Sequence, residues 1–553
     1  MIKGRGNKIE SELSTKEKIR GCVQRVQWIL PVAGLVSLIW FLIRVVPKPS
    51  RATYPCQRVA APLASGFVIW IMGLFGAGVS FRKARSLFRH SHRSLGIICL
   101  CLGICIGVAG LTLNPGSTMF ARTSTDRANA PLGTAKGIWP GRVVWVRDAN
   151  AVSWDGYTGN WYDEARGNQS VISNMMSKSV QWLTGEKTDE AAWSAIFRYY
   201  NRTHGKGDVG YKKGQTIAIK PNLMSCITYD HSDDTYNSVD NDAHLMYAII
   251  DQLVNKAKVP ANKISLYTST SLLSSDQYDQ VVADYLYNKI RSNPSFAGVK
   301  YYDTLGLNGR IKAGVSTHVI KWSVPEAASF ETDHIANVPA DSTYLINFAV
   351  LKSHCIAGVT LCGKNHGGSY CRAYNASISP GHNFLDLHQY MNTGLSGGDY
   401  SGRYRPFVDF MGHKDLGGKT ILYLIDGLWS GNLPRGWNGR PERWNTCGIN
   451  NDWPKSLFSS LDPVAIDSVA YDFCHQQFTI TRMFAHADDY LHEAALANQP
   501  PSGTFYAPNN DGIRLQSLGT HEHWNNPLAK KYSRNISPKK GKGIELISAQ
   551  PKI

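Results

Sequence analysis

The sequence lacks the motifs that would assign a cofactor directly. The glycines of residues 351–368 match neither the GxxxxGK[ST] phosphate loop nor the GxGxxG fingerprint, so a nucleotide is not specifically indicated. No HExxH zinc helix and no EF-hand loop is found in the chain. Cys355, Cys362 and Cys371 lack the close spacing of an iron–sulphur or zinc-knuckle ligand set, so no iron–sulphur cluster is expected.

Most of the chain also has little net charge, although the whole sequence has a formal charge of +17. Residues 1–124 contain 17 Lys and Arg against 3 Asp and Glu, which leaves the other 429 residues at about +3. Nucleic-acid binding needs a basic face on the folded domain. The near-neutral C-terminal part therefore argues against a nucleic-acid partner.

Three apolar segments lie in the basic N-terminal part, at 26–43, 59–81 and 95–113. Each is close to the roughly 20 residues that cross a hydrocarbon core of about 30 Å. The sequence therefore predicts three transmembrane helices within a membrane anchor at 1–113, a linker at 114–139 and an α/β domain at 140–553. Buried helices of a soluble core are the alternative interpretation.

Lysine and arginine are unevenly distributed around these segments. Twelve lie in the N-terminal tail and the second loop, and five lie in the first loop and just after the third segment. By the positive-inside rule, the tail is cytoplasmic. The predicted location is the inner membrane, multi-pass, with the large domain outside the cytoplasm.

Strand and helix patterns alternate through the large domain. Apolar runs predict strands at 141–146, 215–220, 263–268, 299–302, 344–350 and 420–425, and amphipathic patterns predict helices at 188–200, 242–256, 276–291 and 463–477. Such alternation is typical of an α/β fold with a mostly parallel sheet flanked by helices.

Polar residues follow three of the predicted strands at their carboxyl ends, where parallel sheets bind ligands. The candidates for substrate binding are Lys220, Asn222, Lys352, Asn365 and Gly358. The candidates for catalysis are His354, Asp426 and Lys364, which can move protons or orient charge. Solvated loop residues and structural salt bridges are the alternatives.

The charge of this group suggests the ligand class. Lys220, Lys352 and Lys364 place three cations near one crevice, and a helix starting at Gly358 would add free N–H groups. We therefore expect a small anionic molecule, either a carboxylate or a phosphate.

A second group of residues suggests a metal. His521 and His523 flank Glu522, so on an extended segment both imidazoles face the same way. His366 and Asp467 are candidates to complete the ligand set if the fold brings them together. A divalent metal is thus a candidate cofactor, and hydrogen-bonded structural histidines are the alternative.

These residues also carry a resemblance to a known family. The chain resembles the uncharacterised prokaryotic family called domain of unknown function 362 over about 140–480, through its motifs at 220–223, 352–354, 358–361, 364–365, 426–427 and 460–467. Residues 517–526 resemble an exported subgroup. Some members carry a ferredoxin-type cysteine module, which this chain lacks, and the family's Gly-Asn-Gly-Pro stands here as Gly431-Asn-Leu-Pro434.

Two functional hypotheses follow. The first is a membrane-anchored, extracytoplasmic enzyme that acts on a small anionic substrate, with metal assistance as an option. The second is a non-catalytic ligand-binding or accessory module tethered to the membrane. Histidine and carboxylate side chains in one crevice favour the enzyme, and the missing catalytic motif favours the binding module.

Overall fold

The structure is a computed structural model. It describes residues 127–223, 239–268, 281–303, 306–324, 332–354, 357–371, 388–391, 402–432, 440–478, 487–538 and 541–549, together with scattered residues between 36 and 97. The chain divides into two compact units, 1–122 and 123–553. The fold described below is that of the second unit.

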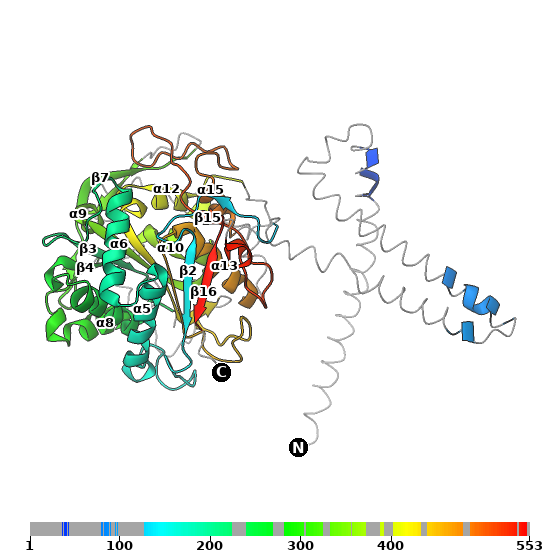
Figure 1. The fold of residues 1–553 in the computed structure, drawn as a ribbon, viewed down its shortest axis with the longest axis horizontal. Helices are drawn as coiled ribbons and strands as arrows, with labels where there is room; N and C mark the ends of the chain where they lie inside the picture. The colour runs from blue at the N-terminus through cyan, green and yellow to red at the C-terminus, as the bar shows by residue number, and fades with distance from the viewer. Residues whose placement is uncertain are drawn as a thin grey trace, which may run out of the picture. The chain divides into compact units, whose positions relative to one another are not determined.

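The second unit is built on an eleven-stranded sheet (Figure 1). Nine of its strands follow the order β16-β2-β14-β12-β9-β3-β4-β5-β6, while β10 pairs with β9 and β13 with β12. Their bounds are β2 Arg142–Arg147, β3 Ile217–Pro221, β4 Ile264–Thr268, β5 Lys300–Asp303, β6 Ile311–Lys312, β9 Tyr344–His354, β10 Gly358–Thr360, β12 Thr420–Asn432, β13 Arg440–Pro441, β14 Ser456–Ser460 and β16 Glu545–Ala549.

Two small sheets accompany the large one. The first has the order β11-β8-β7 and the second consists of β1 and β15. Their bounds are β1 Leu132–Gly133, β7 Val315–Lys321, β8 Thr332–Ala336, β11 Tyr370–Cys371 and β15 Thr520–His521. Residues 132–133, which the sequence placed in a linker, thus pair with a strand near the other end of the chain.

Helices complete the fold. They are α5 Gln169–Thr184, α6 Asp189–Thr203, α7 Ala243–Asp251, α8 Val281–Arg291, α9 Asn337–Asp341, α10 Cys362–Asn365, α11 His388–Met391, α12 Pro406–Gly412, α13 Pro463–Gln477, α15 Asp489–Ala495 and α16 Ser533–Ile536. Strong N-caps explain several starts. Asp462, for example, accepts hydrogen bonds from the backbone N–H groups of Val464 and Ala465, with Pro463 at the first helical position.

The two faces of the large sheet bury separate cores, because successive strand residues point to opposite faces. On β2, Val144 and Val146 pack with apolar residues of α5, α6, α7 and α8. Val143 and Trp145 pack on the other face with α10, α12, α13 and α15. The result is a three-layer arrangement. Figure 1 shows α5 and α6 in front of the sheet, with β2 and β16 side by side although they come from opposite ends of the unit.

The prediction of a mostly parallel sheet is wrong. Among the described strands, the three sheets contain seven antiparallel and six parallel pairings, so the fold is a mixed α/β architecture. The sequence analysis missed β14, which runs antiparallel to both β12 and β2. It also missed the short strands that fold back on β9 and β12, which hydropathy does not mark.

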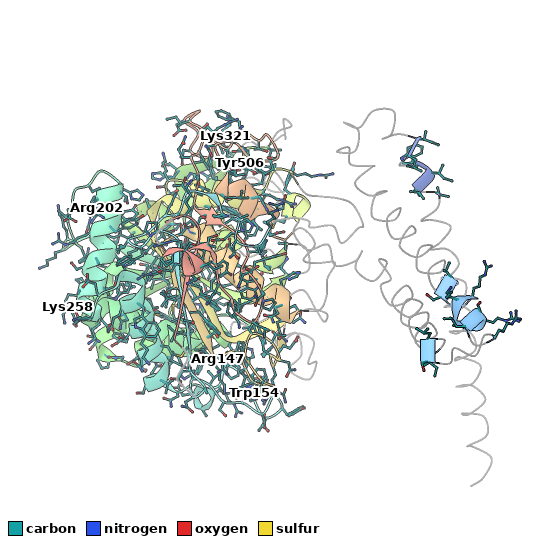
Figure 2. All side chains as sticks on the ribbon, turned by 45° about the vertical axis from the view of Figure 1, so that its right-hand side comes forward. Arg147, Trp154, Arg202, Lys258, Lys321 and Tyr506 are labelled. Carbon is teal, nitrogen blue, oxygen red and sulfur yellow. The ribbon has the colours of Figure 1, made fainter. Side chains whose placement is uncertain are left out.

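Strand direction still brings several carboxyl ends to one edge. The strands β12, β9, β3, β4 and β5 run parallel to one another, and β2 regains the same direction through two antiparallel steps at β14. Arg147 is the last residue of β2. It lies with Trp154 at the lower edge of the domain in Figure 2, whereas Lys321 and Tyr506 lie at the upper edge.

Two of these strands are longer than the sequence predicted. The strand expected to end at residue 350 continues to His354, because Lys352 pairs with Thr360 of β10. The strand expected to end at 425 continues to Asn432, because Gly431 pairs with Pro441 of β13. Residues expected in loops therefore lie on paired backbone.

The expected transmembrane helices require a further correction. No helix in the described part of the chain is both long enough and apolar enough to cross a membrane. This finding contradicts the predicted membrane anchor, the multi-pass inner-membrane location and the extracytoplasmic domain. Most residues of the segments 26–43, 59–81 and 95–113 lie outside the described residues.

Candidate functional site

The side chain of Lys220 is enclosed at the carboxyl end of β3. The residue is 1% exposed, and its Nζ donates a hydrogen bond to the carbonyl oxygen of Pro221 at 2.7 Å. The ammonium lies 6.0 Å from the ring centre of Tyr267. The pKa of Lys220 is lowered to about 7, mainly by burial and also by the nearby charge of Lys364, while Asp240 acts in the opposite direction. Neutral and charged forms therefore coexist near neutral pH.

Three asparagines fix the backbone around this lysine. The Asn365 amide donates to the Lys220 carbonyl oxygen and to Asn347 Oδ1, each at 2.9 Å. Asn222 donates to Asn365 Oδ1 at 3.2 Å. Buried amides that bond to each other hold one geometry, since rotation of either amide would break these hydrogen bonds.

Asp426 connects this group to the segment before α7. Its carboxylate accepts hydrogen bonds from the backbone N–H of Asp242 at 2.7 Å, from that of Leu428 at 3.0 Å and from the Asn241 amide at 3.4 Å. The pKa of Asp426 is raised to about 7, mainly by burial and also by the neighbouring charge of Asp242, while the hydrogen bonds to its carboxylate oppose this rise. Asn241 also accepts from the backbone N–H of Asn222 at 2.6 Å. We call Lys220, Asn222, Asn241, Asn365 and Asp426 the sheet-edge network.

Lys352 has a different environment from Lys220. Its Nζ contacts Asp240 Oδ1 at 3.2 Å and the Val239 carbonyl oxygen at 2.6 Å. Both side chains of the ion pair are almost completely buried. The predicted substrate-binding cation at this position thus has a carboxylate partner within the protein.

Residues 239–242 form the part of the network that the sequence analysis missed. The sequence analysis included only residue 242, as the start of the helix predicted at 242–256, and Asp242 caps α7 by accepting from the backbone N–H of His244. Asp240 and Asn241 come directly before this cap. A run of three polar residues ahead of an apolar helix was the available signal, but it does not distinguish a cap from a binding segment.

Several buried polar atoms near Lys220 have no hydrogen-bond partner among the described residues. They are both ring nitrogens of His366 and Oδ1 of Asn222. His366 is completely buried, and burial lowers its pKa to about 3, with smaller contributions from Lys220 and His413. Native proteins rarely leave such atoms unpaired, which makes this a place for a bound ligand or water.

The other predicted residues lie on a neighbouring hairpin and a short helix. His354 ends β9, and its Nδ1 accepts from the backbone N–H of Ala357 at 3.1 Å. Gly358 opens β10 with φ of +75°, a conformation that favours glycine. The helix expected to start there begins at Cys362 instead and carries Lys364, which is partly buried.

Asp467 of α13 caps the start of α10. Its carboxylate accepts from the backbone N–H groups of Cys362 and Gly363, each at 2.8 Å, and from the Tyr490 hydroxyl at 2.9 Å. The sequence analysis expected free N–H groups at the start of this helix to bind an anion. In the structure, the Asp467 carboxylate already accepts hydrogen bonds from N–H groups there.

His521 and His523 lie close together, but with a partner the sequence analysis did not name. Among the described residues, Asp488, His521 and His523 offer ligand atoms that all lie within 4.8 Å of one another. We call these three residues the histidine cluster. The two other predicted metal ligands, His366 and Asp467, are not members of this group.

With this geometry established, the chain can be compared with known proteins. Residues 217–472 match the model of the family described as Domain of unknown function (DUF362). The predicted resemblance to this family is confirmed. No curated protein and no solved structure gives a match.

The DUF362 match separates the two groups of residues. Every member of the sheet-edge network lies within residues 217–472, as do Lys352, His354 and Lys364. The histidine cluster lies beyond the matched segment, and so do residues 517–526, which suggested a subgroup.

A hollow of about 390 Å³ lies elsewhere, lined by residues that include Arg142, Trp182 and Ile547. Arg142 begins β2, so this hollow is at the amino end of that strand, away from the carboxyl ends that carry the network. Its arginine bonds to Glu545 at 2.8 Å and to the Trp182 carbonyl oxygen at 3.0 Å. Because this cation is already paired, we favour the sheet-edge network as the candidate site.

Proposed function

We propose that this protein is an enzyme that acts on a small anionic substrate at the sheet-edge network. Lys220 transfers the proton, and Lys364 supplies positive charge toward the substrate. The amides of Asn222 and Asn365 orient the substrate. The supporting observation is a completely buried lysine whose hydrogen bond goes to the adjacent carbonyl of Pro221.

The environment of Lys220 suits proton transfer. A general base works best when its pKa is near the working pH, and burial brings the pKa of this amine to about 7. A substrate carboxylate or phosphate would offset the positive charge that Lys220 and Lys364 share. The polar atoms of His366 and Asn222 that lack described partners give the substrate further groups to bind.

Geometry changes the roles that the sequence analysis gave to the other residues. The oxygens of Asp426 accept two backbone N–H groups and an amide, which suits it to holding residues 241–242 in place. Lys352 is paired with Asp240. We therefore assign a positioning role to Asp426 and Lys352, and we assign proton transfer to Lys220.

A ligand screen with two Lys220 variants tests this proposal. The purified full-length protein, Lys220→Met and Lys220→Arg are melted at pH 7 with small carboxylates and phosphate esters. A ligand at 100 times its Kd stabilises its protein by about 2.7 kcal/mol. We expect at least one anion to raise the Tm of the unchanged protein and to leave that of Lys220→Met unchanged.

Products are then sought by mass spectrometry for each anion that binds. Lys220→Arg keeps a positive charge but cannot release a proton near pH 7. We expect this variant to bind the anion without converting it. The proposal fails if no anion binds, or if both variants bind and convert it as the unchanged protein does.

A non-catalytic binding module is the second candidate. The mutual hydrogen bonds of Asn222, Asn347 and Asn365 favour it, because such a rigid group can recognise a ligand without chemistry. Stable binding with no product from the unchanged protein would support this alternative over the enzyme.

A further inference from the structure

Asp488, His521 and His523 come together from two separate parts of the chain. His521 ends β15, His523 follows two residues later, and Asp488 directly precedes α15. We propose that these three residues bind a divalent transition-metal ion. This site is separate from the sheet-edge network and does not depend on the function proposed for it.

A second carboxylate holds His523 in the orientation of a metal ligand. Its Nδ1 lies 2.6 Å from Asp472 Oδ1, so this nitrogen donates its proton to the carboxylate. Asp472 is itself fixed by the backbone N–H of Trp524 at 3.0 Å and by the Tyr532 hydroxyl at 2.9 Å. The other ring nitrogen, Nε2, faces Asp488 Oδ2 at 3.3 Å. A carboxylate behind a histidine is the usual support of a metal-binding imidazole.

A hydroxyl group orients His521 in the same way. Its Nδ1 lies 2.8 Å from Ser468 Oγ, and Ser468 donates its only hydroxyl proton to the Val464 carbonyl oxygen at 2.7 Å. The serine oxygen must therefore accept the proton of His521 Nδ1. Nε2 of His521 then carries the lone pair that a metal needs.

The spacing of the three ligand atoms fits one ion with a small adjustment. Ligand atoms about 2.1 Å from a tetrahedral ion lie about 3.4 Å from each other. The Nε2 of His523 and Oδ2 of Asp488 are already 3.3 Å apart. The ligand atoms lie no more than 4.8 Å from one another, so binding requires movements of about 1 Å.

The type of ligand points to a class of metal. Two imidazoles with one carboxylate suit zinc, iron and similar ions, whereas calcium and magnesium prefer oxygen ligands alone. Three protein ligands leave a coordination position open, as in catalytic zinc and non-haem iron sites. His492 lies beside the site, with its ring centre 4.6 Å from that of His521.

Charge and burial are also compatible with an ion. Asp472 and Asp488 supply two carboxylates, which balance the charge of a divalent cation when both histidines are neutral. Asp488 and His521 are buried, whereas the side chain of His523 is 13% exposed. Enclosure strengthens the electrostatic attraction, and the exposed edge of His523 gives the ion a way in.

Metal titration of the full-length protein tests the site. The chain is treated with a chelator, dialysed, and titrated separately with Zn²⁺ and Co²⁺. We expect one equivalent to bind and the cobalt form to show the visible absorption of nitrogen and oxygen coordination. His521→Gln and His523→Gln should each weaken binding by at least about 100-fold, and Asp472→Asn by about 10–100-fold.

His318→Gln is the matched control, because His318 also contacts a buried carboxylate, Asp415, at 3.0 Å but lies outside the cluster. It should bind zinc as the unchanged protein does. The proposal is overturned if the unchanged protein binds no stoichiometric metal, a result that does not depend on any variant folding. It is also overturned if His521→Gln and His523→Gln both keep full affinity.

Discussion

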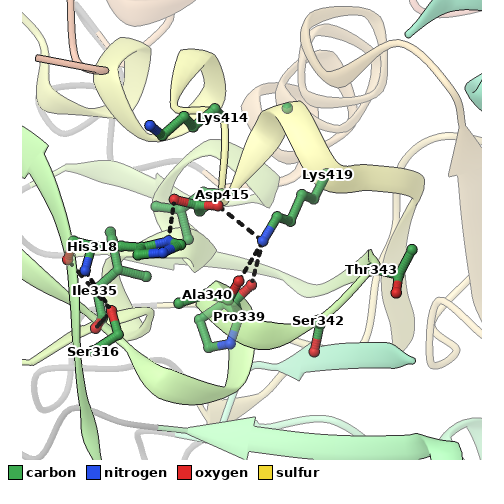
Figure 3. Close-up of polar contacts among 12 residues, drawn as sticks. Ser316, His318, Ile335, Pro339, Ala340, Ser342, Thr343, Lys414, Asp415 and Lys419 are labelled. Carbon is green, nitrogen blue, oxygen red and sulfur yellow. Dashed lines mark hydrogen bonds and ion pairs between the residues drawn. The ribbon is translucent and has the colours of Figure 1, made fainter. Parts of the chain in front are cut away.

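Two regions of this protein hold a lysine side chain in different surroundings. In the junction of His318, Asp415 and Lys419, the Asp415 carboxylate lies 3.0 Å from His318 Nδ1 and 2.9 Å from Lys419 Nζ (Figure 3). Lys419 also donates to the carbonyl oxygens of Pro339 and Ala340. In the sheet-edge network, Lys220 donates to the carbonyl oxygen of Pro221.

This difference indicates a structural role for the junction and a candidate functional role for Lys220. The junction ties β7, α9 and the turn before β12 together, and a carboxylate compensates its positive charge. Burial of Lys220 costs free energy that a neighbouring carbonyl offsets only in part. This unfavourable burial lies at the end of a strand. It supports the interpretation that Lys220 has a role other than stabilising the fold.

The largest expected effect comes from removing a buried cation that does have a partner. Lys352→Met leaves the carboxylate of Asp240 buried without its ion pair, so the free energy of unfolding should fall by roughly 3–5 kcal/mol. Denaturant unfolding of the full chain, followed by tryptophan fluorescence, measures this. The control Lys300→Met changes an exposed lysine and should alter stability by less than about 0.5 kcal/mol. A loss below about 1 kcal/mol for Lys352→Met would show that Asp240 finds another partner.

Lys220→Met should change the free energy of unfolding in the opposite direction and stabilise the protein. Its pKa is lowered from 10.5 to about 7, so the unfolded state binds more protons between these values and stability rises with pH across this window. The cost of burying the charged form is fully present below pH 7. Removing it should stabilise the protein by roughly 1–4 kcal/mol at pH 6, and the gain should shrink as the pH approaches 10. Unfolding curves at several pH values test this, and a destabilised variant at pH 6 would contradict it.

Asp426→Asn tests the link between the network and residues 241–242. The carboxylate accepts from the backbone N–H groups of Asp242 and Leu428 and from the amide of Asn241. Asparagine offers one acceptor oxygen and turns an NH₂ group toward a donor, so we expect a loss of about 1–3 kcal/mol. Thermal unfolding at pH 8 measures it, with the exposed Asp511→Asn as control. Equal stability of the two variants would mean that Asp426 does not hold this segment.

The smallest effect is expected at the junction. Lys419→Met removes an ion pair whose lysine is 19% exposed, and partly solvated pairs contribute about 1 kcal/mol or less. The loss should decrease further in high salt. Unfolding at low and high ionic strength checks this. A salt-independent loss of several kcal/mol would contradict this prediction and would show that Lys419 stabilises the fold as strongly as the buried Lys352.

Particular elements show how much the sequence could predict. The helix predicted at 463–477 is confirmed, and the structure has α13 from Pro463 to Gln477. The apolar run at 344–350 predicted a strand but not its end at His354, because the extension depends on pairing with β10. The parallel sheet was predicted wrongly because β14 contributes two antiparallel pairings through five residues with three serines. The membrane helices expected in the first unit are contradicted within the described residues.

The sequence by itself determined the local chemistry of this protein: its apolar strands, its helix caps, its resemblance to the DUF362 family and a set of polar residues at strand ends. Tertiary structure decided which charges meet. It gave Lys352 the carboxylate of Asp240, left Lys220 beside a carbonyl, and joined His521 and His523 to Asp488. In the pairings made by Asp240 and Asp488, the residues are 33 to 112 positions apart in the chain, and local sequence patterns carry no information about such contacts. Lys220, by contrast, bonds to the carbonyl of the next residue in the chain.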